Sequence, residues 1–245
     1  DEFEGPLPTS TQSDFYYAAH DSLYYDHLLR DVADYYGAVS GGRFTLDYRV
    51  HGTVASLAEG MAYYGDHPEE GEQSVLLAAD AIAALDAEID FSLYDTVLLI
   101  HAGAGEETDV LGNSPEQIYS TYLGPEDFQQ AVKDSVLAVP YIATEDHPDG
   151  AGVRHVLILP ENQFQDAFEG FSGYYGSLGV YCFEVGLRLG MLSLTDFTPA
   201  GAPDSQGIGQ FGLMGYGLFS AGGFVPPEPC AFNKQLMGWL DPYRA

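Results

Sequence analysis

The fold is decided by a glycine-bounded apolar stretch, Gly179-Val180-Tyr181-Cys182-Phe183-Glu184-Val185-Gly186-Leu187-Arg188-Leu189-Gly190. We expect it to form a helix, on which residues four positions apart project from one face. Phe183 and Leu187 form such a pair, and Glu184 lies between them. Ser193 follows Gly190 by three residues. These positions decide what chemistry the segment can perform.

The spacing is that of the pattern H-E-x-x-H-x-x-G-x-x-H/D, in which the His and the final residue bind zinc and the Glu is a general base. Here Phe183 and Leu187 replace the two His, and Ser193 stands at the third ligand position. Glu184 and Gly190 are kept. Because Phe and Leu cannot donate a lone pair, we expect no zinc and no peptide hydrolysis at this site. Their side chains should instead pack into the space of the metal.

Three flanking segments share further motifs with one family. They are Tyr94-Asp95-Thr96-Val97-Leu98-Leu99-Ile100-His101-Ala102-Gly103-Ala104-Gly105-Glu106-Glu107, Gly207-Ile208-Gly209-Gln210-Phe211-Gly212-Leu213-Met214, and Cys230-Ala231-Phe232-Asn233-Lys234 with Leu236-Met237-Gly238-Trp239. The chain thereby resembles the secreted metallopeptidases of the immune inhibitor A type. That family has Y-D-x-x-x-x-x-H-A-G-x-G-x-E before its active-site helix, and G-I-G-x-W-x-L-M and AW-x-K-x-x-L-G-W after it. The resemblance extends over roughly residues 10 to 240.

The resemblance implies a zincin-like α/β (α+β) fold, with a twisted mixed sheet and helices, as one domain over 1–245. An extended lead-in would cover 1–14 and an N-terminal subdomain 15–178. Residues 179–245 would hold the motif helix, a Met-turn at Met214 and a C-terminal helix. Cys182 and Cys230 fall in segments that the family packs together, so the resemblance implies a disulfide and an oxidising compartment. Two buried free thiols are the alternative.

Composition restricts the partners. The chain has 8 Lys plus Arg against 37 Asp plus Glu, a net charge of −29. Such a field repels nucleic acid, whose binding requires clustered Lys and Arg. No apolar run approaches the 18 or more residues that typically span a bilayer, so we expect no membrane span. Since the chain starts at Asp1 without Met, we expect a mature, processed segment, and the resemblance implies that it is secreted.

Local patterns predict further elements. Helices are expected at 21–36, with Asp21 as N-cap and Gly37 as stop, and at 72–88. Strands are expected at 43–50, 96–100, 132–141 and 154–159, and a loop at 112–130, where Thr121 replaces a His of the family. In the strand at 43–50, the alternate residues Phe44, Leu46, Tyr48 and Val50 should be half-buried. His101 is expected to be a hydrogen-bonded structural residue.

These observations predict a catalytically inactive, metallopeptidase-like extracellular module that works by structure, binding or self-assembly. Its partner would be an unknown extracellular protein or a second copy, met through a Tyr-rich surface. The alternative is an active extracellular hydrolase with a non-standard metal or nucleophile site. No cofactor is expected except, as an open possibility, calcium at Asp196 and Asp204, whose acidic loop lacks the D-x-D-x-D-G pattern. A purely structural role for these two residues is the other interpretation.

Overall fold

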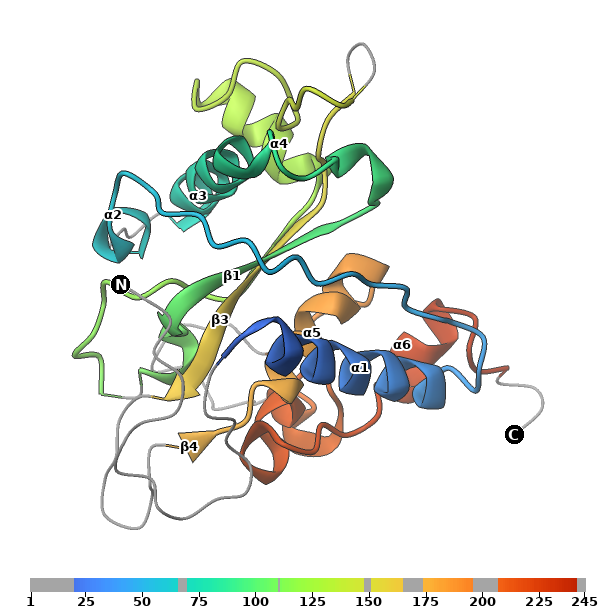
Figure 1. Ribbon diagram of the computed structural model, residues 1–245. Coiled ribbons are helices and arrows are strands. Elements are labelled where there is room, and N and C mark those ends of the chain that lie inside the picture. Colours follow the sequence, from blue (N-terminus) through green and yellow to red (C-terminus); the bar gives the residue numbers. More distant parts are fainter. Residues whose placement is uncertain are drawn as a thin grey trace. The chain divides into compact units, whose positions relative to one another are not determined.

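The computed structural model describes residues 20–65, 70–109, 111–147, 151–164, 174–195 and 207–241, without the side chains of 70–72, 164, 174 and 175. The chain divides into two compact units, which we call unit 1 and unit 2 (Figure 1). Unit 1 contains the described residues of 52–173, and unit 2 contains those of 5–51 and 174–245. The chain therefore leaves unit 2 after His51 and returns to it at Tyr174. This division differs from the expected subdomain boundary at 178, and the assignment of one domain to the whole chain stays a prediction.

Unit 1 is built on a small mixed sheet. Its central strand is β3 (Val156–Phe164), with β1 (Val97–Ala104) parallel to it on one side and β2 (Thr121–Leu123) antiparallel on the other. In the ladder, Val97 lies opposite Val156. The mixed α/β class is thereby confirmed.

The buried strands explain why this part of the sheet was predictable. Residues 156–159 are all buried, the pattern of a strand covered on both faces. Continuous apolar runs mark both β3 and β1 in the sequence. The strands predicted at 154–159 and 96–100 are confirmed.

Helices cover the sheet of unit 1. Helix α3 (Glu70–Leu85) packs against α2 (Met61–Gly65), α4 (Pro125–Lys133), β2 and β3, and it confirms the helix predicted at 72–88. The core of this unit includes Val75, Ala78, Ile82, Phe91, Phe128, Ala131, Val156 and Ile158. The 3-10 helices η1 (Phe91–Leu93) and η2 (Glu106–Thr108) also belong to unit 1.

Two predictions for unit 1 are wrong. The expected loop at 112–130 contains β2 and most of α4, which starts at Pro125 after Gly124. The Gly124 N–H donates to the Asp127 carboxylate at 2.7 Å, so a local cap starts the helix where the composition is typical of a loop. The expected strand at 132–141 is absent among the described residues, because α4 continues to Lys133 and then turns through Ser135, whose φ is +65°.

Unit 2 contains α1 (Ser22–Val39), β4 (Tyr174–Tyr175), α5 (Leu178–Leu189), η3 (Gly209–Phe211), η4 (Tyr216–Gly223) and α6 (Ala231–Leu236). Helix α1 packs against α5, and α5 packs against η4. The buried face of α1 follows helical spacing and consists of Tyr25, Leu29, Val32, Tyr36 and Val39.

The start of α1 was predicted correctly and its end was not. Asp21 caps the helix, since its Oδ1 accepts from the N–H groups of Leu23 and Tyr24 at 3.0 and 3.1 Å. Gly37 lies inside the helix, which continues to Val39. The chain turns instead at Gly41 and the following Gly42, which have φ values of +64° and +74°. The helix therefore ends where glycines adopt left-handed backbone, and a glycine with helical backbone, such as Gly37, does not end it.

An aromatic cluster closes unit 2 around the single tryptophan. The Trp239 ring lies 6.1 Å from that of Tyr36 and 6.2 Å from that of Phe44, measured between centroids. The Arg43 guanidinium donates a hydrogen bond to the Trp239 carbonyl. This cluster fixes the C-terminal residues on α1, and Trp239 is therefore a natural fluorescent reporter for the folding of unit 2.

Residues 43–50 keep the alternation of a strand without forming one. Phe44, Leu46, Tyr48 and Val50 are half-buried, as predicted, and the residues between them are exposed. No strand is assigned here, however, so the prediction of a paired strand is wrong. The side-chain pattern is satisfied by packing on one side, and a ladder partner for the backbone is missing from the described part of the chain.

Candidate functional site

Helix α5 presents the positions expected of the metal-binding helix. Phe183 and Leu187 are half-buried, and Glu184 is 4% exposed. The backbone carbonyl of Cys182, the residue before Phe183, accepts a hydrogen bond of 2.5 Å from the Tyr36 hydroxyl of α1. The pKa of Tyr36 is raised by burial, by Cys182 and Tyr35, and further by Glu184. Glu184 is thus held in the buried part of unit 2 beside a neutral tyrosine.

The end of α5 has the geometry of a Schellman motif. Gly190 has a φ of +96°, its N–H donates to the Leu187 carbonyl, and the Met191 N–H donates to the Gly186 carbonyl. Met191 is 2% exposed, so the turn is fixed by apolar packing as well. This turn sends the chain toward Ser193, the position of the third ligand.

Met214 packs directly against α5. A Cβ atom added to Gly186 would lie 2.7 Å from the Met214 sulfur, so the helix and the methionine approach at van der Waals distance only because residue 186 is glycine. Met214 is fully buried, and its carbonyl accepts from the Leu194 N–H at 2.6 Å. The segment that follows the turn at Gly190 is therefore attached to the segment that contains Met214.

The side chain of Asn233 on α6 attaches the same region to the C-terminal segment. Its Oδ1 accepts from the Leu192 N–H and its Nδ2 donates to the Leu192 carbonyl, both at 3.0 Å. Asn233 is fully buried. Ser193, the next residue, is half-buried, and its hydroxyl accepts only weakly, at 3.4 Å, from the Thr195 N–H. Asn233 falls at a variable position of the resembled motif AW-x-K, which is why the sequence did not single it out.

The residues of this site do not fit a zinc ion. A structural or catalytic zinc needs about three protein ligands with N, S or O donors. Phe183 and Leu187 provide none, and Ser193 provides a hydroxyl alone. Within the described ranges, no three His, Cys, Asp or Glu side chains gather in a way that could hold a metal ion. Asp196 and Asp204, the calcium candidates, lie outside the described residues, so calcium binding there stays a prediction.

The disulfide expected between Cys182 and Cys230 is not formed. Both cysteines are free, Cys182 buried on α5 and Cys230 half-buried at the start of α6. Burial raises the pKa of the Cys182 thiol, and Asp31 on α1 adds to this. Cys230 packs instead beside Gly212, where an added Cβ would lie 3.4 Å from its own. The two side chains face different neighbours, and a disulfide requires Cβ atoms that point toward each other.

Unit 1 contains a polar cluster around Glu107 and Glu161, which the sequence did not reveal. Glu107 accepts three hydrogen bonds: from the Ser120 hydroxyl at 2.5 Å, the Ser120 N–H at 3.1 Å and the Gln163 amide at 2.6 Å. Glu161 is fully buried and accepts from the Gly103 N–H at 3.0 Å. The sequence feature that could have revealed this cluster is the polar run at the carboxyl end of β3, which lies next to the carboxyl end of the parallel strand β1.

His101 lies in this cluster as a hydrogen-bonded residue, as predicted. Its Nδ1 is 3.0 Å from the Ala102 carbonyl, which requires that Nδ1 carry a proton. Burial lowers the pKa of His101, although the Ala102 carbonyl, Glu107 and Glu161 act in the opposite direction. His101 is therefore neutral at pH 7, with its lone pair on Nε2.

The lowered pKa of His101 predicts a pH dependence of stability. The unfolded chain binds a proton near pH 6.5, whereas the folded chain does so only at lower pH. Stability is therefore complete above about pH 6.5 and is lost as the pH falls below it. We expect His101→Asn to reduce this loss, because Asn can still donate to a carbonyl without titrating.

This prediction is checked by urea unfolding of wild type and His101→Asn from pH 8 to pH 5. Amide hydrogen exchange of β1 and β3 is the signal that reports unfolding. The control is His147→Asn, since His147 also forms a hydrogen bond through its ring, to Thr144 at 2.5 Å. An identical pH profile in wild type and His101→Asn would contradict the assignment.

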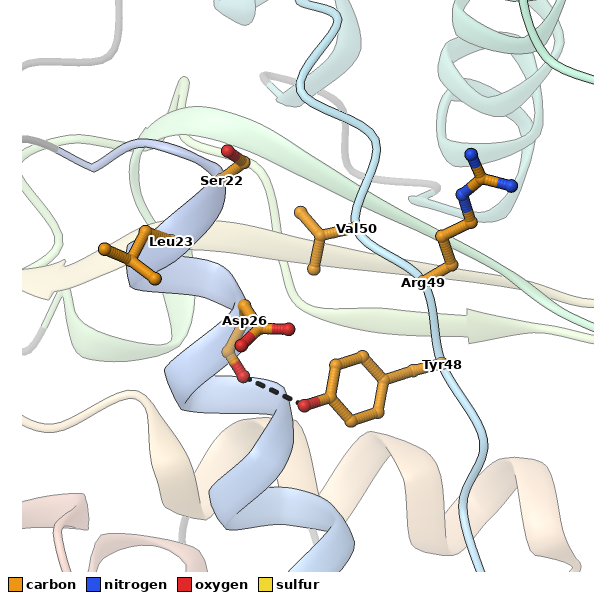
Figure 2. A pocket seen from close by; sticks show the side chains of 6 residues that line it. All are labelled: Ser22, Leu23, Asp26, Tyr48, Arg49 and Val50. Carbon is orange, nitrogen blue, oxygen red and sulfur yellow. Dashed lines mark hydrogen bonds between the residues drawn. The ribbon is translucent and has the colours of Figure 1, made fainter.

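Unit 2 also has a surface pocket of about 420 Å³ beside α1 (Figure 2). The first turns of α1 form one wall and the extended chain at 48–50 forms the other. The Tyr48 hydroxyl donates to the Asp26 carbonyl at 3.1 Å across the pocket. The lining residues are Ser22, Leu23, Asp26, Tyr48, Arg49 and Val50.

No helix in the described ranges is long and apolar enough to cross a membrane. In comparisons with known proteins, no family model matches the chain, and no curated protein resembles it significantly.

Proposed function

We propose that this chain is a metallopeptidase-like extracellular module without zinc-dependent activity, which works by association with another protein or with a second copy. One observation carries the proposal: α5 is a helix that bears Phe183 and Leu187 where the resembled motif has its two zinc-binding His. The helix, the turn at Gly190 and the contact between Gly186 and Met214 all have the form that the zincin-like interpretation needs. The donor atoms that would make this architecture catalytic are missing.

The chemistry of the remaining groups supports the same conclusion. A zinc ion lowers the pKa of its bound water to about 7 and polarises the substrate carbonyl. Glu184 without such an ion would have to activate ordinary water, whose pKa is about 15.7. Its position in the buried part of unit 2, 4% exposed, further separates it from solvent.

Exposed apolar side chains of unit 2 support a role in association. Phe211 on η3 is 93% exposed, which is unusual for a phenylalanine in a soluble protein. The same C-terminal part of the chain contains several other exposed apolar residues. They are Leu192, Tyr216, Phe224, Val225, Phe232 and Leu236.

The high negative charge limits how the module can associate. With a net charge of −29, two copies or two acidic proteins repel each other at low ionic strength. Salt of about 0.1 M reduces the range of this repulsion to about 10 Å. Association is therefore expected through short-range contacts, and its strength should rise with salt.

The proposal predicts the metal content of the protein. Purified without chelator, it should contain no stoichiometric zinc by elemental analysis, and it should not cleave a denatured protein substrate. Glu184→Gln should leave association unchanged, because no catalytic base is removed. A triple variant, Phe183→His with Leu187→His and Ser193→Asp, should gain zinc affinity, since it restores three ligands at the required spacing.

A matched control separates metal binding from loosened packing. Phe183→Ala with Leu187→Ala removes the same apolar side chains without adding ligands, and it should gain no zinc. The proposal fails if the unmodified protein contains stoichiometric zinc, or if it shows chelator-sensitive cleavage that Glu184→Gln abolishes.

A further inference from the structure

The segment at 45–50 has the side-chain arrangement of a strand. Tyr48 and Val50 point toward α1, whereas Arg49 between them points away (Figure 2). Thr45, Asp47 and Arg49 are exposed, and the even-numbered residues between them are half-buried. One face of this segment is thus packed on unit 2 and the other meets solvent.

Within the part of the chain that the structure describes, the backbone of this segment has no ladder. The Phe44 N–H donates to the Ser40 hydroxyl at 3.1 Å, but residues 45–50 form no backbone hydrogen bond with any other described residue. A strand-like segment with unpaired N–H and C=O groups is a template for pairing with another chain. Neither a proline nor a lysine, two residues that commonly protect such edges, occurs within it.

The exposed face is complementary to itself. When two copies pair antiparallel about a two-fold axis at Tyr48, Asp47 of each copy lies opposite Arg49 of the other. The axis repeats this pairing, so one dimer has two opposite-charge pairs on the same face. On the other face, Leu46 lies opposite Val50 twice, and both residues are apolar.

Arg49 is available for such a pair. The chain has 37 acidic residues and only 8 Lys plus Arg, yet no carboxylate of the described residues forms an ion pair with Arg49. Asp47 likewise has no ion-pair partner within the described ranges. Two opposite charges on the same face, two residues apart, favour a second copy over a strongly acidic or strongly basic peptide.

We propose that residues 46–50 pair with the same residues of a second copy to form an antiparallel two-stranded ribbon, and that this ribbon joins the protein into a two-fold dimer. The inference rests on the proposed function in one respect: it specifies the second copy as the partner of a module that works by association.

Charge reversal tests the register of the ribbon. Sedimentation velocity in about 0.15 M and about 0.5 M NaCl gives the dimer dissociation constant for wild type, Asp47→Arg, Arg49→Asp and the double variant. Each single reversal creates two like-charge pairs and should weaken the dimer about tenfold or more. The double variant restores both pairs in the opposite sense, at the net charge of wild type, and should return to within about threefold of wild type.

A variant outside the segment controls for net charge. Glu116→Arg changes the charge as Asp47→Arg does, and its exposed side chain lies in a turn of unit 1. It should not weaken the dimer, because a less negative copy repels its partner less.

Three outcomes would overturn the ribbon. They are a wild type that stays monomeric in both salts, a dimer that is indifferent to the single reversals, and a double variant that does not recover. Each outcome rejects this pairing, and the second assigns association to another surface. Zinc content and cleavage, measured on the same samples, keep the proposals separate: zinc-free monomers would reject the ribbon alone, whereas a zinc-containing, cleaving protein would reject the proposed function.

Discussion

Replacing Gly179 with alanine is expected to lower the free energy of unfolding of unit 2 by about 3 kcal/mol. Gly179 is buried on α5, and an added Cβ would lie 1.8 Å from the Leu218 carbonyl oxygen of η4. The obstacle belongs to the backbone, so a rotamer change cannot relieve it. Alanine improves helix propensity by roughly 1 kcal/mol, but displacement of η4 outweighs this gain.

The measurement is urea unfolding followed by the fluorescence of Trp239, the single tryptophan, which lies in the aromatic cluster of unit 2. The matched control is Gly37→Ala on α1. Gly37 is also inside a helix, and an added Cβ would meet nothing within 4 Å. That variant should be more stable than wild type by roughly 0.5 to 1 kcal/mol. Equal shifts in the two variants would show that α5 and η4 are not in close contact.

The elements predicted from sequence were those with strong periodic or apolar signals. Helix α1 and the buried strand β3 are specified by patterns that tertiary packing then uses directly. The helix α4 was missed because its nine residues are mostly polar outside Phe128 and Ala131. A short helix of this kind is fixed by its cap and by two buried side chains. Neither feature produces a periodic apolar pattern long enough to recognise in the sequence.

The segment at 43–50 shows a different limit of sequence reasoning. Its alternation correctly predicted which side chains are half-buried, because that property depends only on an extended chain beside an apolar surface. Whether a neighbouring strand is present depends on the rest of the fold. The local sequence contains no information on this point, so the prediction of a strand at 43–50 was wrong.

The candidate site was predictable along α5 and less so around it. The spacing of Phe183, Glu184 and Leu187 defines a helix face, and Met214 lies against that helix at Gly186. The pairing of Cys182 with Cys230 failed, because proximity of two segments does not decide which way a side chain points on a helix. The cluster around Glu107 and Glu161 depends on the parallel pairing of distant strands, which no local pattern specifies.

Replacing Asn233 with alanine is the second change with a large expected effect, a loss of about 2 to 3 kcal/mol in the free energy of unfolding of unit 2. The fully buried side chain makes two hydrogen bonds of 3.0 Å to the backbone of Leu192. Its truncation leaves the N–H and the carbonyl of Leu192 without these partners, and it also leaves a small cavity. Both contributions act in the same direction.

The effect of Asn233→Ala should also be local, because the two hydrogen bonds of the Asn233 side chain attach the turn after α5 to α6. We expect the Leu192 amide to exchange its hydrogen much faster in the variant, at a urea concentration far below the unfolding midpoint. Asn113→Ala is the control, since Asn113 is exposed in unit 1, and it should change stability by less than about 0.5 kcal/mol. If Asn233→Ala behaved like this control in both measurements, the turn after Gly190 would have to be held by Met191 and Met214 instead. The position of Ser193 would then depend on apolar packing alone.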